Sequence, residues 1–218
     1  MRASRPAISI AAIFCAVSIA AAGVILGQFS QSSIPDVPPA PVAKPATPKG
    51  PRISYPKNGF PALTLPDGEH RIVKSVLNVD RKLVYGDYVW NDDGVPQGKV
   101  WVRVDLGKQL LSVFRDGHEI GSTVIIYGAD SKETPIGVFP VLAKDENYWS
   151  KSYDQAMPYM LQLTRDVVAI HAAGVRDGAA THGCIGVPAE FARLLFGQVK
   201  VGDIVAVTAA DQAAAKPV

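Results

Sequence analysis

The class of the fold is set by residues 100–127, which read VWVRVDLGKQLLSVFRDGHEIGSTVIIY. Apolar and polar residues alternate over 100–105, and apolar runs follow at 110–114 and 120–127, with Asp116-Gly117 between these two runs. Asp-Gly between two strand-like runs favours a two-residue hairpin, because both residues tolerate a positive φ. This stretch therefore predicts a mostly β domain built around a hairpin.

Further elements are predicted on either side of this stretch. Strands are expected at 137–142, 167–171 and 203–207. A helix is expected where Pro188 sits at a first-turn position, Phe191, Leu194 and Leu195 share one face, and Gly197 provides a stop. The apolar spacing within 71–79 predicts a second short helix. The expected fold is mainly β, sandwich-like or barrel-like, with one or two short helices.

Charge and cysteine content exclude several classes of protein. The 218 residues carry a net charge of +2 and two cysteines. Four basic residues and one acidic residue lie in 1–51, which leaves 18 basic and 19 acidic residues in 52–218. A nearly neutral domain has no electrostatic footprint for nucleic acid, and two cysteines cannot build a disulfide framework. We therefore expect neither a nucleic-acid-binding domain nor a small disulfide-rich one.

The N-terminal segment predicts export. Residues 7–27 carry no charge and are long enough for a helix that spans the roughly 30 Å core of a bilayer. Arg2 and Arg5 precede the span, which places the N-terminus in the cytoplasm and the rest of the chain across the membrane. Residues 1–30 are thus expected to anchor the protein in the inner membrane, facing the periplasm. The small residues at 20–22 leave a cleaved signal peptide as an alternative.

The remaining chain divides by composition. Residues 31–51 are rich in Pro and Ala and are expected to form a semi-rigid linker. Residues 52–98 carry no assignable motif and are treated as an N-terminal extension of unknown role. The domain proper is expected at 99–208, followed by a short tail at 209–218.

Chemistry-bearing residues gather between His171 and Cys184. His182 stands two residues before Cys184 with Gly183 between them, and no other cysteine follows residue 51. A nucleophilic cysteine needs a base or a cation to raise its thiolate fraction above that of a thiol with a pKa of about 8.5, and imidazole serves this purpose. Two other interpretations remain open: a buried, inert thiol, and a zinc site with His171, His182 and Cys184 as ligands.

This segment resembles the YkuD-type L,D-transpeptidase catalytic domain of bacterial cell-wall enzymes. The family signature is a histidine followed, after a loop, by Ser/Thr-His-Gly-Cys, which here reads His171 and then Thr181-His182-Gly183-Cys184. The element Thr134-Pro135-Ile136-Gly137 also resembles a family motif upstream of the active site. The resemblance covers about 99–208 and implies an L,D-transpeptidase-type β fold.

The resemblance implies a role for each residue of the signature. Cys184 would be the nucleophile and His171 the base, with the backbone carbonyl of Ala172 orienting the imidazole. Gly183, His182 and the backbone of Cys184 would stabilise the oxyanion. The reaction needs no metal and no other cofactor.

Residues that bind substrate are also expected from the resemblance. They are Thr181, Tyr159, Met160, Gly186 and Arg176. Gly186 departs from the family pattern, in which an arginine commonly follows the cysteine by two residues. The role of that arginine is therefore expected to be lost or to be taken by another residue such as Arg176 or Arg193.

The implied function is peptidoglycan L,D-transpeptidation in cell-wall biogenesis. Cys184 would attack the L,D bond of a tetrapeptide stem, release D-alanine, and pass the acyl group from a thioester to an amine. Carbapenem-type inhibitors would acylate Cys184. The other function that remains open is a module of the same fold that binds peptidoglycan without turnover.

Overall fold

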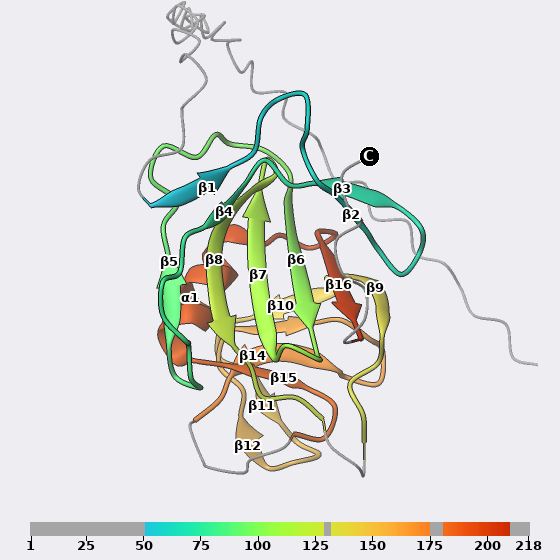
Figure 1. Cartoon of the computed structure of the whole chain (residues 1–218). Coiled ribbons are helices and arrows are strands. Elements are labelled where there is room, and N and C mark those ends of the chain that lie inside the picture. The colour runs from blue at the N-terminus through green and yellow to red at the C-terminus, as the bar shows by residue number, and fades with distance from the viewer. Residues whose placement is uncertain (1–50, 129–131, 175–180, 210–218) are drawn as a thin grey trace, which may run out of the picture. The chain divides into compact units, whose positions relative to one another are not determined.

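The computed structural model describes residues 51–128, 132–174 and 181–209, and all structural statements refer to these residues (Figure 1). The predicted apolar helix at 7–27, the linker and Arg176 lie outside them. Two sheets and one helix dominate the described residues, which agrees with the predicted mainly β fold. Within these ranges no helix combines the length and apolar character needed to cross a bilayer.

The larger sheet has eight strands. Its order is β1-β4-β8-β7-β6-β16-β9, with β5 paired to β8 off this path. The strands are β1 (Arg52–Ser54), β4 (Ser75–Leu77), β5 (Tyr88–Trp90), β6 (Val100–Asp105), β7 (Leu110–Arg115), β8 (His118–Val124), β9 (Gly137–Pro140) and β16 (Ile204–Thr208). The predicted hairpin is confirmed: Asp116 and Gly117 connect β7 to β8 with φ values of 49° and 79°, which a tight turn of this kind requires.

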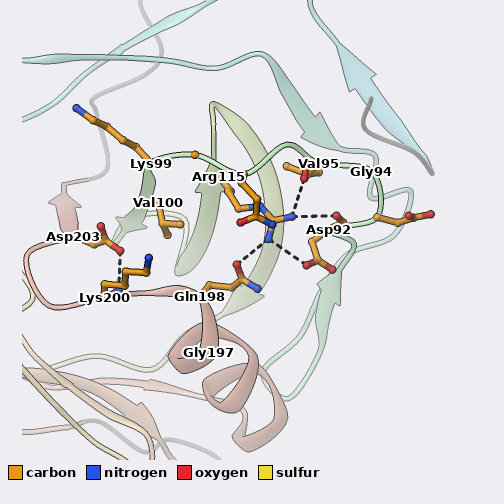
Figure 2. Close-up of a pocket in the computed structure, with 13 residues that line it drawn as sticks. Asp92, Gly94, Val95, Lys99, Val100, Arg115, Gly197, Gln198, Lys200 and Asp203 are labelled. Atoms are coloured by element: carbon orange, nitrogen blue, oxygen red, sulfur yellow. Dashed lines mark hydrogen bonds and ion pairs between the residues drawn. The ribbon is translucent and has the colours of Figure 1, made fainter. Parts of the chain in front are cut away.

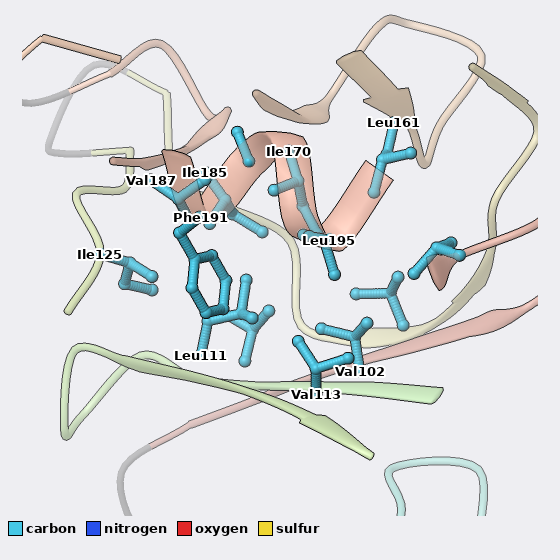
Figure 3. Close-up of a cluster of buried hydrophobic side chains, with 14 of the residues drawn as sticks. Val102, Leu111, Val113, Ile125, Leu161, Ile170, Ile185, Val187, Phe191 and Leu195 are labelled. Carbon is cyan, nitrogen blue, oxygen red and sulfur yellow. The ribbon is translucent and has the colours of Figure 1, made fainter. Parts of the chain in front are cut away.

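A smaller sheet and a helix complete the core. The smaller sheet has the order β10-β13-β14-β15 and comprises β10 (Ala143–Asp145), β13 (Met160–Gln162), β14 (Ala169–Ala172) and β15 (Ile185–Val187). Helix α1 (Ala189–Gln198) inserts Phe191 and Leu195 among Ile170 and Ile185 of the smaller sheet and Leu111 of the larger one (Figure 3). All five side chains are buried, so a single apolar cluster fixes the two sheets against each other.

Two short hairpins stand outside these sheets. One joins β2 (Ala62–Thr64) to β3 (His70–Ile72), and the other joins β11 (Trp149–Ser150) to β12 (Gln155–Ala156).

The prediction of a helix at 71–79 is wrong, because this segment contributes to the strands β3 and β4. Ser75 and Leu77 are buried whereas Val76 between them is partly exposed, which is the alternation of a strand. The backbone N–H of Leu77 donates to the Glu119 carboxylate at 2.8 Å, and β4 lies parallel to β8. Tertiary pairing therefore overrides the local apolar spacing.

The predicted helix at 188–197 is confirmed with changed ends. Pro188 is the N-cap residue, and Gly197 lies inside the helix rather than ending it. The helix stops at Gln198 because Val199 is extended, with φ −81° and ψ 141°. The Lys144 ammonium donates to the carbonyls of Phe196 and Val199 and so satisfies acceptors that the helix end leaves open.

Candidate active site

Cys184 and His171 line one pocket of about 400 Å³. The signature residues Thr181 and His182 line it too, together with the Ala172 that follows the histidine. The structure thus brings together five of the residues singled out in the sequence.

Strand register explains why the side chains of Cys184 and His171 face the same pocket. β14 and β15 are parallel neighbours with Ile170 opposite Ile185, and both of these side chains point into the apolar core. Because side chains alternate along a strand, His171 and the residue before Ile185 point to the opposite face. That residue is Cys184, which shares this face with Ala169.

His171 is held in one tautomer. Its Nδ1 lies 2.8 Å from the carbonyl oxygen of Ala172, and a carbonyl can only accept a hydrogen bond, so Nδ1 carries the proton of the neutral ring. The buried Nε2 has no hydrogen-bond partner among the described residues. Burial lowers the pKa of His171, an effect that the bond to Ala172 only partly opposes. The ring therefore offers an unprotonated Nε2 in the pocket.

Cys184 is a neutral thiol at rest. Its side chain is buried, and Sγ lies 3.6 Å from the carbonyl oxygen of Val167. Burial raises the pKa of Cys184, whereas a backbone hydrogen bond from Ala169 and the charge of Lys132 lower it less. With the pKa of His171 lowered and that of Cys184 raised, the pair favours thiol and imidazole over thiolate and imidazolium.

The backbone before Cys184 is fixed by Thr134. The buried Thr134 hydroxyl accepts from the N–H of Gly128 at 2.9 Å and donates to the carbonyl of Gly183 at 3.0 Å. The Gly183–Cys184 peptide is trans, so the N–H of Cys184 points away from Thr134. Thr134 belongs to the recognised Thr-Pro-x-Gly motif, but its contact with Gly183 spans 49 positions and is not predicted by the sequence.

Glycines allow this arrangement. Gly183 has a φ of 95°, which side-chain-bearing residues rarely adopt. A Cβ on Gly128 would lie 2.2 Å from the Lys132 carbonyl oxygen and 2.7 Å from the Cα of Gly183.

The other signature residues close the turn and the rim of the pocket. The Thr181 hydroxyl donates to the carbonyl of Cys184, so it ties the turn together. The exposed His182 ring stacks on Tyr153 with centroids 5.0 Å apart. Tyr153 lies between β11 and β12 and lines the pocket with Gln155, and the sequence predicts neither residue at the site.

Three residues expected to bind substrate do not line the pocket. Tyr159 packs against Phe196 at 5.8 Å between ring centroids. Met160 is buried in a cluster with Cys184, but behind the pocket wall. Gly186 exchanges two backbone hydrogen bonds with Ile126, and a Cβ there would lie 2.6 Å from the Ile126 side chain.

No arginine or lysine among the described residues lines the Cys184 pocket. The space at Gly186 that an arginine would enter is filled by Ile126 and by Ala173, whose Cβ would lie only 2.7 Å from a Cβ added to Gly186. Arg193 lies on α1 and forms an ion pair with Glu190 at 3.0 Å instead of facing the pocket.

A larger pocket of about 1010 Å³ shares no lining residue with the first (Figure 2). Its buried guanidinium, that of Arg115, is already bound to the Gln198 side chain at 2.9 Å, the Asp92 carboxylate at 3.4 Å and the Val95 carbonyl at 3.0 Å. No histidine or cysteine among the described residues lines it. The Cys184 pocket is therefore the candidate active site.

The described residues contain no group of three or more His, Cys, Asp or Glu side chains that could hold a metal ion. At the Cys184 pocket, Nδ1 of His171 is engaged by a carbonyl and the ring of His182 by Tyr153.

A buried thiol and an imidazole with a free Nε2 thus line the same pocket, an arrangement that can support nucleophilic chemistry. Residues 99–207, half of the chain, match the family model of the L,D-transpeptidase catalytic domain, YkuD. The chain therefore belongs to the YkuD family of L,D-transpeptidase catalytic domains. A search of curated proteins finds no match.

Solved structures similar to this chain include three L,D-transpeptidases. One from Stackebrandtia nassauensis is 26% identical over 50% of this chain and 55% of its own, with a TM-score of 0.48. One from Enterococcus faecium is 26% identical over 51% of this chain and 50% of its own, with a TM-score of 0.47. L,D-transpeptidase 3 from Mycobacterium tuberculosis, in complex with a faropenem-derived adduct, is 20% identical over 59% and 71%, with a TM-score of 0.48. The chain thus spans about half the length of the first two.

Proposed function

We propose that this chain is a peptidoglycan L,D-transpeptidase with Cys184 as nucleophile. The observation that carries the proposal is His171, whose Nδ1 bonds to the Ala172 carbonyl while Nε2 remains free in the pocket that Cys184 lines. Nucleophile, base and orienting group are the parts that acyl transfer requires.

The first half-reaction forms a thioester. Sγ of Cys184 attacks the carbonyl carbon between the third residue of the stem and D-alanine, and Nε2 of His171 accepts the thiol proton. Backbone N–H groups of Gly183 and Cys184, with His182, stabilise the oxyanion. When the intermediate collapses, the C–N bond breaks, the proton passes from His171 to the leaving amine, and D-alanine departs.

The second half-reaction transfers the acyl group. An acceptor amine attacks the thioester carbon while His171 takes one of its protons, and the thiol of Cys184 leaves with that proton. A stem amine as acceptor gives a 3→3 crosslink, whereas a free D-amino acid gives exchange. No cofactor enters either step.

The test uses purified protein and tetrapeptide-containing muropeptides analysed by mass spectrometry. We expect loss of D-alanine and a crosslinked or exchanged product, both absent for Cys184→Ala. Turnover that persists in Cys184→Ala would overturn the proposal. Stem binding by wild-type protein without turnover would favour the non-catalytic wall-binding module instead.

A carbapenem provides a second readout of the same nucleophile. We propose that it acylates Cys184, whose thiol lines the same pocket as the free Nε2 of His171. Intact-protein mass spectrometry should show one adduct, located in the Cys184 peptide and absent from Cys184→Ala.

We also propose that the domain works in the cell envelope, anchored by residues 7–27 on the periplasmic side of the inner membrane. The support is the uncharged stretch and the two preceding arginines. Sequencing the N-terminus of membrane-fraction protein tests this: Met1 indicates an anchor, and a start after residue 20 indicates cleavage.

A further inference from the structure

We propose that Tyr85 is a positioning residue for the catalytic base, although it lies outside the family match at 99–207. Its hydroxyl donates to the carbonyl of Ala173 at 3.2 Å, and Ala173 lines the Cys184 pocket. This inference rests on the proposed function only in that it assigns His171 as the base.

Ala172 and Ala173 carry the backbone that orients His171. The N–H of Ala172 donates to the Pro158 carbonyl at 2.9 Å, and its carbonyl accepts from Nδ1 of His171 at 2.8 Å. The N–H of Ala173 donates to the Val187 carbonyl at 3.0 Å. Tyr85 supplies the fourth bond and thereby completes the set of backbone groups in these two residues.

The position of that fourth bond explains how it can affect the orientation of His171. The carbonyls of Ala172 and Ala173 belong to consecutive peptide planes that meet at the Cα of Ala173, so fixing the second plane limits the movement of the first. β14 ends at Ala172, and the N–H of Ala173, bonded to Val187 of β15, is the last backbone group that the strand ladder holds. The Tyr85 hydroxyl holds the peptide plane at the point where that support ends.

Tyr85 itself is held rigidly. It occupies a turn in which the N–H of Asp87 donates to the Val84 carbonyl at 2.9 Å, and Gly86 has a φ of 101°. The Asp87 carboxylate accepts from the Val84 N–H at 3.1 Å, and the Asp87 carbonyl accepts from the buried Thr123 hydroxyl of β8 at 2.8 Å. The large sheet therefore fixes the turn that carries Tyr85.

The hydroxyl of Tyr85 is suited to donate. Burial raises the pKa of Tyr85, so the phenol is protonated at neutral pH. A donated hydrogen bond to Ala173 keeps the peptide plane of Ala172 in place, and with it the tautomer that leaves Nε2 of His171 unprotonated.

The test compares Tyr85→Phe with Tyr88→Phe in the full chain. Each variant loses one hydroxyl, and Tyr88 lies three residues away in β5, with its ring against Phe191 at 6.0 Å. The rate of Cys184 alkylation by iodoacetamide is measured from neutral to high pH by peptide mass spectrometry. This readout needs no peptidoglycan, so it decides on Tyr85 even if the chain fails to turn over stems.

Alkylation of Tyr85→Phe should be about three- to tenfold slower at pH 7, the effect of one hydrogen bond. At high pH, where hydroxide ionises the thiol without His171, the alkylation rate of Tyr85→Phe should match that of the wild type. The rate of Tyr88→Phe should match that of the wild type at every pH. In turnover, kcat should fall with KM unchanged. An unchanged rate for Tyr85→Phe at pH 7, or the same slowing at every pH, would overturn the proposal.

Discussion

At the scale of single residues, the site depends on burial of two titratable groups. His171 is kept neutral and Cys184 is kept protonated because each would lose hydration on ionising inside the pocket. In the proposed reaction the proton would therefore move from Sγ to Nε2 during attack, so His171 would act as a general base and not as half of a resting ion pair.

Stability should depend on pH through His171. The pKa of His171 in the folded protein lies below the ordinary 6.5. As pH falls past 6.5, the imidazole therefore binds a proton in the unfolded chain before it does so in the folded one. The free energy of unfolding in urea should therefore drop between pH 7.5 and pH 5.5, and His171→Gln should lose part of this slope. Parallel profiles for the two proteins would contradict the assignment.

Thr134→Val should harm both stability and reactivity. The substitution leaves the N–H of Gly128 and the carbonyl of Gly183 buried without their partner, which costs about 1–3 kcal/mol. Urea unfolding and Cys184 alkylation measure the two effects. Thr134→Ser keeps the hydroxyl and is the matched control. Loss in Thr134→Ser but not in Thr134→Val would show that the methyl group matters instead of the hydrogen bonds.

The sequence reveals some of these residues and conceals others for a physical reason. His171, Thr181, His182 and Cys184 stand out because they lie within one short segment. Tyr153 reaches the same site only through packing of distant segments, and the motif that contains Thr134 does not reveal its contact with Gly183. No local pattern carries that information.

At the scale of elements, β15 is held on both sides. It is parallel to β14, and Gly186 forms an antiparallel bridge with Ile126 on the other side. β15, which directly follows Cys184, is thus bonded both to the smaller sheet and to the segment after β8 of the larger sheet. This close approach explains why glycine occupies position 186.

Gly186→Ala should destabilise the protein by about 1–3 kcal/mol, because its Cβ would overlap Ile126 at 2.6 Å and Ala173 at 2.7 Å. Gly197→Ala, in helix α1 with open space around the added Cβ, should instead stabilise it by about 0.5–1 kcal/mol. Urea denaturation of both variants checks the opposite signs. A stable Gly186→Ala protein would mean that β15 can shift without cost.

Elements are predictable where local chemistry decides them. The turn between β7 and β8 needs positive φ at Asp116 and Gly117, which those residues permit. The segment 71–79 is predicted wrongly because its apolar spacing also fits a helix, whereas Leu77 is committed to a strand by its bond to Glu119. Pairing partners far along the chain decide that case.

At the scale of the whole molecule, three strands within residues 52–98 lie in the larger sheet, together with strands of the region that matches the family. β1, β4 and β5 extend it through β8. The Trp90 ring packs edge-on against Phe191 at 5.5 Å, and Arg52 donates to the carbonyl of Glu119. These contacts cover the apolar surface of α1 and the polar groups at the edge of β8.

A protein that starts at residue 99 should therefore fail to fold, whereas one that starts at residue 51 should unfold cooperatively in urea. The shorter chain loses five strands, three of them from the larger sheet, and leaves the buried Glu119 carboxylate without the Leu77 N–H. Far-UV circular dichroism and size-exclusion chromatography distinguish the outcomes. A monomeric 99–218 protein of equal stability would show that the extension is dispensable.

The place of β16 has a consequence for how the chain folds. This last strand lies between β6, which it meets in parallel, and β9, which it meets antiparallel. Until residues 204–208 arrive, β6 and β9 are separate edges with unpaired backbone groups, and such edges aggregate. The sheet can close only after residues 204–208 have left the ribosome, so we expect closure of the sheet to be post-translational and slow, because the pairing is non-local.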